Sequence, residues 1–215
     1  MAPHRDDEVL GVGGTLARAA TEGEATYVVF VTQGGPPTFD LELVARLADE
    51  AKRAHALLGV RETFELGFPA AAIDGVAHQD LNAELTRVVR EVRPERLFIP
   101  YGGDLHMDHQ LIWLSSLVAA RPSTDWTPRA VYAYETLSET NWNAPYFSPA
   151  FQPTAYIDIS PHLDAKVKAM EIYASQIRPF PHERSAEAIR ALAAVRGSAI
   201  GVEAAEAFVL IRQLL

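Results

Sequence analysis

Apolar residues follow two different patterns along this chain, an unbroken run and a helical spacing. These patterns predict alternating strands and helices. Residues 27–32 form an unbroken run of β-branched and aromatic side chains, which is typical of a strand buried on both faces. Apolar side chains then recur at helical spacing within residues 41–58: Leu43, Leu47, Ala51, Ala54 and Leu58. Gly59 follows this stretch as a helix C-cap would. The pattern therefore predicts a buried strand followed by an amphipathic helix.

The same two patterns recur over the rest of the chain. We expect further helices over residues 10–20, 81–92, 163–176 and 186–196, and strands over residues 63–66, 96–100, 130–134 and 155–159. Residues 204–215 fit a helix or a strand. Strands that alternate with helices indicate βαβ units and a mostly parallel sheet. We therefore expect a three-layer α/β fold, a Rossmann-like sheet flanked by helices, in a single domain of residues 1–215.

Composition excludes several classes of partner and site. The net charge of −9 argues against a nucleic acid or an anionic membrane as the main partner, since both attract clustered Lys and Arg. The chain has no cysteine, so any metal must be held by His, Asp and Glu. No apolar run reaches the roughly 18 residues that a membrane span needs, and no signal-peptide pattern is present. We expect a cytoplasmic protein that acts on a small molecule.

Two short polar segments carry the candidate chemistry: HRDDE at residues 4–8 and HMDH at residues 106–109. The second segment follows the predicted strand 96–100, and the first holds the equivalent place if a strand precedes it. Ligand sites of α/β sheets lie beyond the carboxyl ends of the strands, so the two segments can converge on one point. Histidine and carboxylate groups brought together in this way predict a metal site.

The residue types favour a catalytic zinc site. Catalytic zinc commonly takes three His or carboxylate ligands and keeps a fourth position for water. His4, one of the two aspartates Asp6 and Asp7, and a histidine of the second segment would supply such a set. The remaining aspartate is then free to act as a base on water whose pKa the metal lowers.

These segments resemble the motifs of a known family. PHRDDEVLGVGGTL, at residues 3–16, looks like the signature of the PIG-L (LmbE-like) zinc-dependent N-deacetylases, usually His-Pro-Asp-Asp-Glu followed by Gly-Gly-Thr. HMDH is similar to the family's second motif, His-x-Asp-His. YASQ at residues 173–176 and RGSAIGVEAAEAF at residues 196–208 are similar to its C-terminal stretches. The resemblance therefore spans nearly the whole chain.

The resemblance implies a role for each matching residue. It implies three ligands for Zn²⁺ or another divalent metal, which are His4, Asp7 and His109, and it implies that Asp6 is the general base. His106 matches the residue that stabilises the tetrahedral intermediate and protonates the leaving amine, and Asp108 matches its orienting partner. Arg46 lies near the position of a sugar-binding arginine. The implied reaction removes the acetyl group from an N-acetylglucosamine-type substrate, and the family often forms homo-oligomers.

The chain departs from the family pattern in two places. Arg5 replaces the usual proline, which relaxes the backbone at that turn without removing a ligand. Family members also have an apolar strand that leads into the motif, whereas here only Met1, Ala2 and Pro3 precede His4. We therefore expect that the chain is trimmed or that its first strand is missing.

Three other interpretations compete with the deacetylase. The glycines at residues 11, 13 and 14 invite a dinucleotide-binding interpretation, but the strand at 27–32 is followed by Gln33 and Gly34 rather than by an acidic residue that would hold a ribose. We favour the simpler interpretation, in which Gly13 and Gly14 allow a helix to pack closely on the sheet. The second interpretation is a non-catalytic metal-binding scaffold of the same fold. The third is a zinc amidohydrolase that acts on another amide.

Overall fold

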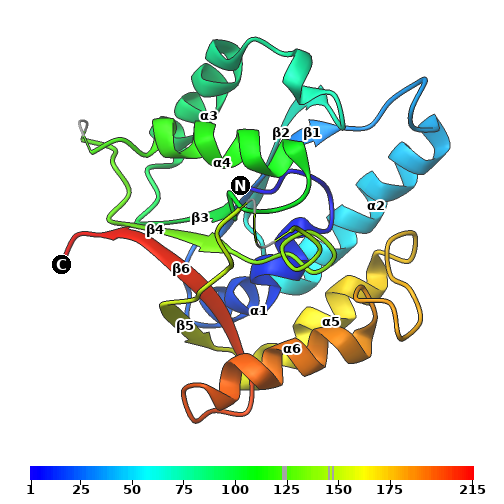
Figure 1. The fold of residues 1–215 in the computed structure, drawn as a ribbon, viewed down its shortest axis with the longest axis vertical. Coiled ribbons are helices and arrows are strands. Elements are labelled where there is room, and N and C mark those ends of the chain that lie inside the picture. The colour runs from blue at the N-terminus through cyan, green and yellow to red at the C-terminus, as the bar shows by residue number, and fades with distance from the viewer. Residues whose placement is uncertain (123–124, 145, 147) are drawn as a thin grey trace.

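The computed structural model describes residues 1–122, 125–144, 146 and 148–215. Strands and helices alternate through the first half (Figure 1): α1 (Asp7–Thr21), β1 (Tyr27–Gln33), α2 (Leu41–Leu58), β2 (Glu62–Pro69), α3 (His78–Val92), β3 (Arg96–Pro100) and α4 (Met107–Ala119). The second half contains β4 (Ala130–Tyr134), β5 (Ala155–Asp158), α5 (Leu163–Ile172), α6 (Ala186–Ser198) and β6 (Ala205–Gln213). Two short 3₁₀ helices cover Ile73–Gly75 and Ser160–His162.

The strands form two hydrogen-bonded groups. β1 and β2 pair in parallel, and a four-stranded sheet has the order β3-β4-β6-β5. β3 and β4 are parallel, whereas β6 runs antiparallel to both of its neighbours. Helices flank the strands, as the sequence predicted (Figure 1). The α/β fold is thus confirmed, and its antiparallel pairs all involve β6, in the segment that fitted either a helix or a strand.

The first three residues link the two groups of strands. The Ala2 N–H donates to the Val29 carbonyl at 2.8 Å, and the Val31 N–H donates to the Ala2 carbonyl at 3.0 Å. The amino group of Met1 donates to the Phe98 carbonyl of β3 at 2.8 Å. The strand that family members have before His4 is reduced here to this short link. The link still fixes the position at which the HRDDE segment begins. A cavity of about 490 Å³ lies beside the link, between β1 and β3.

α1 packs very closely on its neighbours because of its glycines. A Cβ atom at Gly11 would overlap the ring of Tyr134, and one at Gly14 would lie 2.7 Å from Cδ1 of Ile159. Both distances are too short for real side-chain contacts, so larger residues would push the helix away from β4 and the segment before α5. The contacts support the packing interpretation of the glycine cluster.

The structure corrects several predicted boundaries and adds one helix. α1 and α3 each begin three residues before the predicted position, at Asp7 and His78. The helix expected over residues 163–176 ends at Ile172, because the backbone leaves helical geometry at Tyr173, where ψ is 60°. The chain then turns, and the N–H groups of Gln176 and Ile177 donate to the Tyr173 carbonyl. β2 is longer than the predicted residues 63–66, and α4 is a helix that the pattern did not predict.

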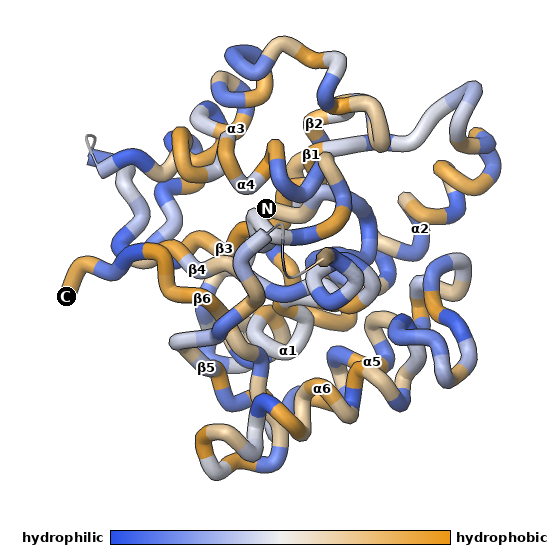
Figure 2. The backbone as a smooth tube through the Cα atoms, viewed as in Figure 1, coloured by the Kyte–Doolittle hydropathy of each residue, from blue (hydrophilic) through white to orange (hydrophobic). Residues whose placement is uncertain are grey.

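Hydropathy along the backbone agrees with this arrangement (Figure 2). β6 is mostly apolar, whereas α2 and α3 alternate between apolar and polar residues, as expected for helices with one face in water. Among the described helices, none combines the length and the apolar character that crossing a membrane requires.

Candidate metal centre

A tight turn at the start of α1 brings His4 and Asp7 together. Asp6 is the N-cap residue and has a φ of 114°, a left-handed conformation that is uncommon for a residue with a side chain. Its N–H donates to Oε2 of the buried Glu8 at 3.1 Å, which holds this conformation. The His4 N–H donates to Oδ2 of Asp7 at 2.8 Å. The turn therefore places the first predicted histidine directly beside the Asp7 carboxylate.

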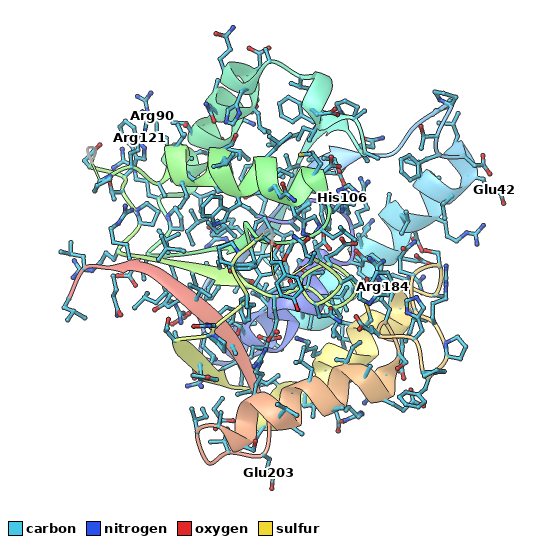
Figure 3. All side chains as sticks on the ribbon, in the orientation of Figure 1. Glu42, Arg90, His106, Arg121, Arg184 and Glu203 are labelled. Carbon is cyan, nitrogen blue, oxygen red and sulfur yellow. The ribbon has the colours of Figure 1, made fainter. Side chains whose placement is uncertain are left out.

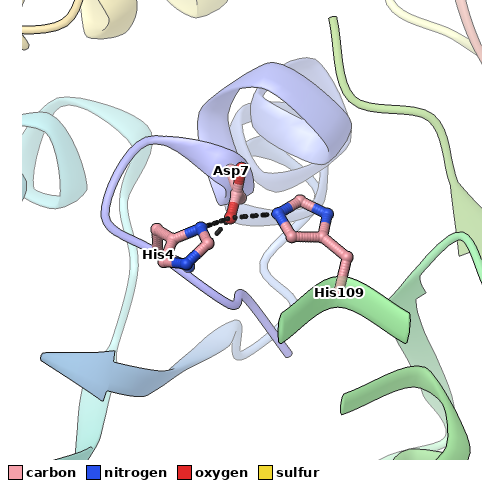
Figure 4. Close-up of side chains that lie close together, drawn as sticks. All are labelled: His4, Asp7 and His109. Atoms are coloured by element: carbon pink, nitrogen blue, oxygen red, sulfur yellow. Dashed lines mark hydrogen bonds and ion pairs between the residues drawn. The ribbon is translucent and has the colours of Figure 1, made fainter. Parts of the chain in front are cut away.

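α4 supplies the second histidine. His109 lies in the first turn of α4 and is completely buried. Its Nδ1 lies 2.8 Å from Oδ2 of Asp104, a carboxylate that can only accept, so the Nδ1–H donates. This bond leaves Nε2 turned toward Asp7, with 3.2 Å between Nε2 and Oδ2 (Figure 4). Residues more than 100 positions apart in the sequence thus meet at one point.

The three side chains have the donor set and spacing of a metal site. Ligand atoms of His4, Asp7 and His109 all lie within 4.8 Å of one another. His109 Nε2 and Asp7 Oδ1 are among the buried polar atoms of the described residues that make no hydrogen bond, although Nε2 forms an ion pair with Asp7 Oδ2. Buried polar atoms rarely stay unpaired, and two nitrogens with a carboxylate are ordinary zinc ligands. The arrangement therefore fits a divalent metal.

Electrostatics tie the three groups to one another. Burial alone would lower the pKa of His109, but the Asp7 and Asp104 carboxylates raise it to about 10. Burial likewise opposes the charge on His4, yet Asp108 and Asp7 raise its pKa to about 9. Burial would raise the pKa of Asp7, and the two histidines hold it well below its ordinary value instead. The carboxylates thus favour positive charge at this position, as they would favour a cation.

A second group of possible ligands shares His4. Atoms of His4, His106 and Asp108 also lie within 4.8 Å of one another. Oδ2 of Asp108, however, already accepts from the Ala71 N–H at 2.8 Å and lies 2.9 Å from His4 Nε2. The first group alone contains the buried unpaired atoms, so we assign the metal position to it.

His106 caps the N-terminus of α4. Its Nδ1 accepts from the Asp108 N–H at 3.1 Å, so in the neutral ring the proton resides on Nε2. The carboxylate oxygen Oδ1 of Asp108 lies 4.0 Å from Nδ1, beyond hydrogen-bond distance. Asp108 therefore orients His106 through its backbone, whereas its carboxylate contacts His4.

Asp6 lies beside the metal position and is paired with an arginine from far along the chain. Nη1 of Arg184 lies 2.8 Å from Oδ2 of Asp6, and Nε of Arg184 donates to the Ser138 hydroxyl. Burial raises the pKa of Asp6 to about 7, although Arg184 opposes the shift. Figure 3 labels His106, at the N-terminal end of α4, and Arg184, on the loop between α5 and α6.

Sequence reasoning missed both Arg184 and Asp104. Arg184 is one of two arginines on the irregular loop between α5 and α6, and nothing near it in the sequence sets it apart. Asp104 had a usable signal, since it lies in the same polar segment as His109 and five residues before it. Arg5, the departure from the family motif, is buried and pairs with Glu65 of β2 at 3.0 Å.

A pocket of about 210 Å³ opens over these groups. Its polar side includes His4, Asp6, His106 and Arg184. Arg46 is exposed on α2 and is not among the described residues that line this pocket. The structure thus brings six predicted residues together and leaves Arg46 outside the pocket.

The first 119 residues match the model of the family described as PIG-L: GlcNAc-PI de-N-acetylase. The chain belongs to this family. It is 25% identical to the diacetylchitobiose deacetylase of Thermococcus kodakarensis over 193 residues, 85% of this chain and 70% of that protein. It is 30% identical over 220 residues to a 1D-myo-inositol 2-acetamido-2-deoxy-alpha-D-glucopyranoside deacetylase of Mycobacteroides abscessus, with 81% and 79% of the two chains covered.

A solved structure of another protein also resembles this PIG-L chain over its full length. The conserved protein TT1542 from Thermus thermophilus superposes with a TM-score of 0.79 at 28% identity. The match covers 100% of this chain and 94% of that one. The fold assigned above from strand order therefore agrees with the fold of a related protein.

Proposed function

We propose that this PIG-L protein is a metal-dependent N-deacetylase that hydrolyses the acetamide of an N-acetylglucosamine-type substrate. The observation that carries the proposal is the group His4, Asp7 and His109, whose member His4 lines a pocket together with Asp6 and His106. The names of two relatives, which are deacetylases of acetamido sugars, support the same reaction. We also propose that residues 1–215 form one domain, since β6 near the C-terminus pairs with β4 of the central sheet.

We propose that His4, Asp7 and His109 hold the metal and that the metal is zinc. When bound, zinc supplies a positive charge that polarises the acetamide carbonyl and lowers the pKa of a water molecule. Asp104 fixes the ring of His109 through Nδ1, so that Nε2 is the atom that faces the metal position. The metal position remains accessible to a substrate in the pocket, because the side chain of His4 is partly exposed.

Asp6 is the proposed general base. It accepts a proton from the attacking water, whose oxygen bonds to the carbonyl carbon. Arg184 contacts the carboxylate of Asp6 and fixes its position between the turn and the pocket. The left-handed backbone at Asp6, held by Glu8, directs its carboxylate away from that of Asp7, which serves as a ligand.

His106 is the proposed general acid. Because its Nδ1 accepts from the helix N-terminus, the neutral ring has its proton on Nε2. That proton passes to the nitrogen of the acetamide as the carbon–nitrogen bond breaks, which yields acetate and a free amine. Asp108 supports this role through its backbone N–H. Arg46 remains a predicted sugar contact that would lie outside the pocket.

The test compares metal content with acetate release from N-acetylglucosamine and its simple glycosides. We expect about one zinc per chain in the wild type and in Asp6→Ala, with acetate release reduced about 10²- to 10⁴-fold in the variant, the usual contribution of a general base. His109→Ala should lose both the zinc and the release of acetate. Zinc binding by the wild type without acetate from any of these sugars would favour the scaffold or a different amide substrate.

A further inference from the structure

The pocket beside the metal position has one polar side and one apolar side. The apolar side, called here the α2 wall, consists of Phe39, Leu43, Val44 and Leu47. None of the proposed metal, base or acid roles uses these residues. The question is therefore which part of a substrate they contact.

The α2 wall continues a helical stripe that begins in the hydrophobic core. Toward the C-terminal end of α2, Ala51, Ala54 and Leu58 are buried at 3%, 0% and 1% exposure. Leu43 and Leu47 belong to the same stripe one to two turns earlier, yet both are only half-buried and line the pocket. Half-buried apolar side chains beside a reacting centre offer a surface from which an apolar ligand group can displace water.

Exposed apolar side chains also adjoin the pocket residues in the chain. Leu105 and Met107 flank His106, and both are more than 50% exposed at 52% and 53%. The Trp142 ring, 53% exposed, lies 6.0 Å from the ring of His182, on the loop that leads to Arg184. Large exposed apolar side chains close in the chain to such residues are consistent with an apolar ligand near this pocket.

The charges in the pocket do not suit an anionic group. Among the described residues that line it, the arginines are Arg5 and Arg184, and each is already paired with a carboxylate. Arg5 pairs with Glu65 at 3.0 Å and Arg184 with Asp6 at 2.8 Å. A phosphate beside the sugar would have to compete for these arginines in a protein of net charge −9.

We propose that the substrate is an N-acetylglucosaminide with an uncharged apolar aglycone, which lies against the α2 wall. This inference rests on the proposed deacetylase function and names the substrate class of the same site. The acetamide faces the metal position, and the alkyl or aromatic aglycone covers Leu43 and Leu47.

The test uses the zinc-loaded protein and a matched series of substrates. Acetate release is measured for methyl, butyl and octyl 2-acetamido-2-deoxyglucosides of one anomer, each below its critical micelle concentration, and for N-acetylglucosamine 1-phosphate. We expect kcat/KM to rise about tenfold from methyl to octyl, a gain that burial of about two methylene groups provides. The 1-phosphate should be a poorer substrate than the methyl glucoside.

Two substitutions on one helix locate the effect. Leu43→Gln should lower the octyl-to-methyl ratio of kcat/KM at least threefold, whereas Leu57→Gln should leave the ratio unchanged. Leu57 is 45% exposed on α2 and is not among the described pocket residues, so it is the matched control. Leu43→Ala, which keeps an apolar and smaller side chain, provides a second variant if the glutamine variant does not fold.

The outcomes separate this inference from the function on which it rests. A flat series in the wild type, or an equal ratio in wild type and both Leu43 variants, overturns the apolar aglycone. Turnover of the methyl glucoside would still support the deacetylase in that case. If none of the glycosides releases acetate, the proposed function itself fails.

Discussion

Asp104 contacts the proposed metal ligand His109 and is not itself a proposed ligand. Its carboxylate accepts from Nδ1 of His109, and its other oxygen accepts from the Thr140 hydroxyl at 2.6 Å. We expect Asp104→Ala to weaken zinc binding about 10- to 100-fold, because His109 loses its orientation and basicity. Competition with a fluorescent zinc chelator measures the change. Asp49→Ala, at an exposed position of α2, is the control, and equal zinc affinities in the two variants would refute the role.

At the level of single residues, local motifs carried most of the information about the site. The predicted residues of HRDDE and HMDH meet because each segment lies at the start of a helix, α1 or α4. The sequence showed the helix after HRDDE and the strand before HMDH, but neither a strand before HRDDE nor the helix α4. The role of Arg184 could not be predicted from local motifs, because its contact with Asp6 joins positions 178 residues apart. The contact of the Asp108 carboxylate with His4 also depends on side-chain geometry that no spacing encodes.

α1 is kinked at Val12, and a buried ion pair accompanies the kink. Val12 has non-helical backbone angles, and the N–H groups of Gly14 and Thr15 donate to the Glu206 carboxylate. Lys166 of α5 donates to the Leu10 carbonyl at 2.8 Å and pairs with Glu206 at 2.5 Å. The pair thus joins α1, α5 and β6 at a place where the helix backbone is distorted.

We expect Lys166→Met to destabilise the protein by about 3 kcal/mol, because it leaves the Glu206 carboxylate buried without its cation. Urea unfolding followed by circular dichroism measures the loss. Lys168→Met, on the exposed face of the same helix, should change the free energy of unfolding by less than about 0.5 kcal/mol. A similar loss in both variants would mean that the ion pair contributes nothing specific.

Elements with a clear period were predicted well, and those without one were not. The boundaries of β3 and β4 were predicted correctly, and those of α2 as well, because a buried run or an amphipathic stripe marks them. α4 was missed because its apolar and polar residues do not separate onto two faces, and polar residues such as Ser115 and Ser116 lie on its buried side. β6 could not be assigned from its sequence, because it is a strand only through its pairing with β4 and β5.

At the scale of the whole molecule, the metal position joins two separate parts of the core. Val9 and Leu10, which follow the proposed ligand Asp7 on α1, belong to one cluster with Val28 and Phe30, whereas α4 packs in the second cluster through Ile112. No hydrogen bonds join β1 directly to β3 in the described part of the chain, and the first three residues provide the link. A metal bound by His4, Asp7 and His109 would therefore connect the N-terminal segment to α4.

This connection predicts that zinc stabilises the fold. With free zinc at 100 times its Kd, binding adds about 2.7 kcal/mol to the free energy of unfolding, or roughly 5–10 °C in Tm for a chain of this size. Chelation should reverse the shift, and His109→Ala should abolish it, because the variant lacks a ligand in α4. His162→Ala is the control, since His162 lies outside the group of possible ligands. An equal zinc-dependent shift in both variants would place the metal elsewhere in the molecule.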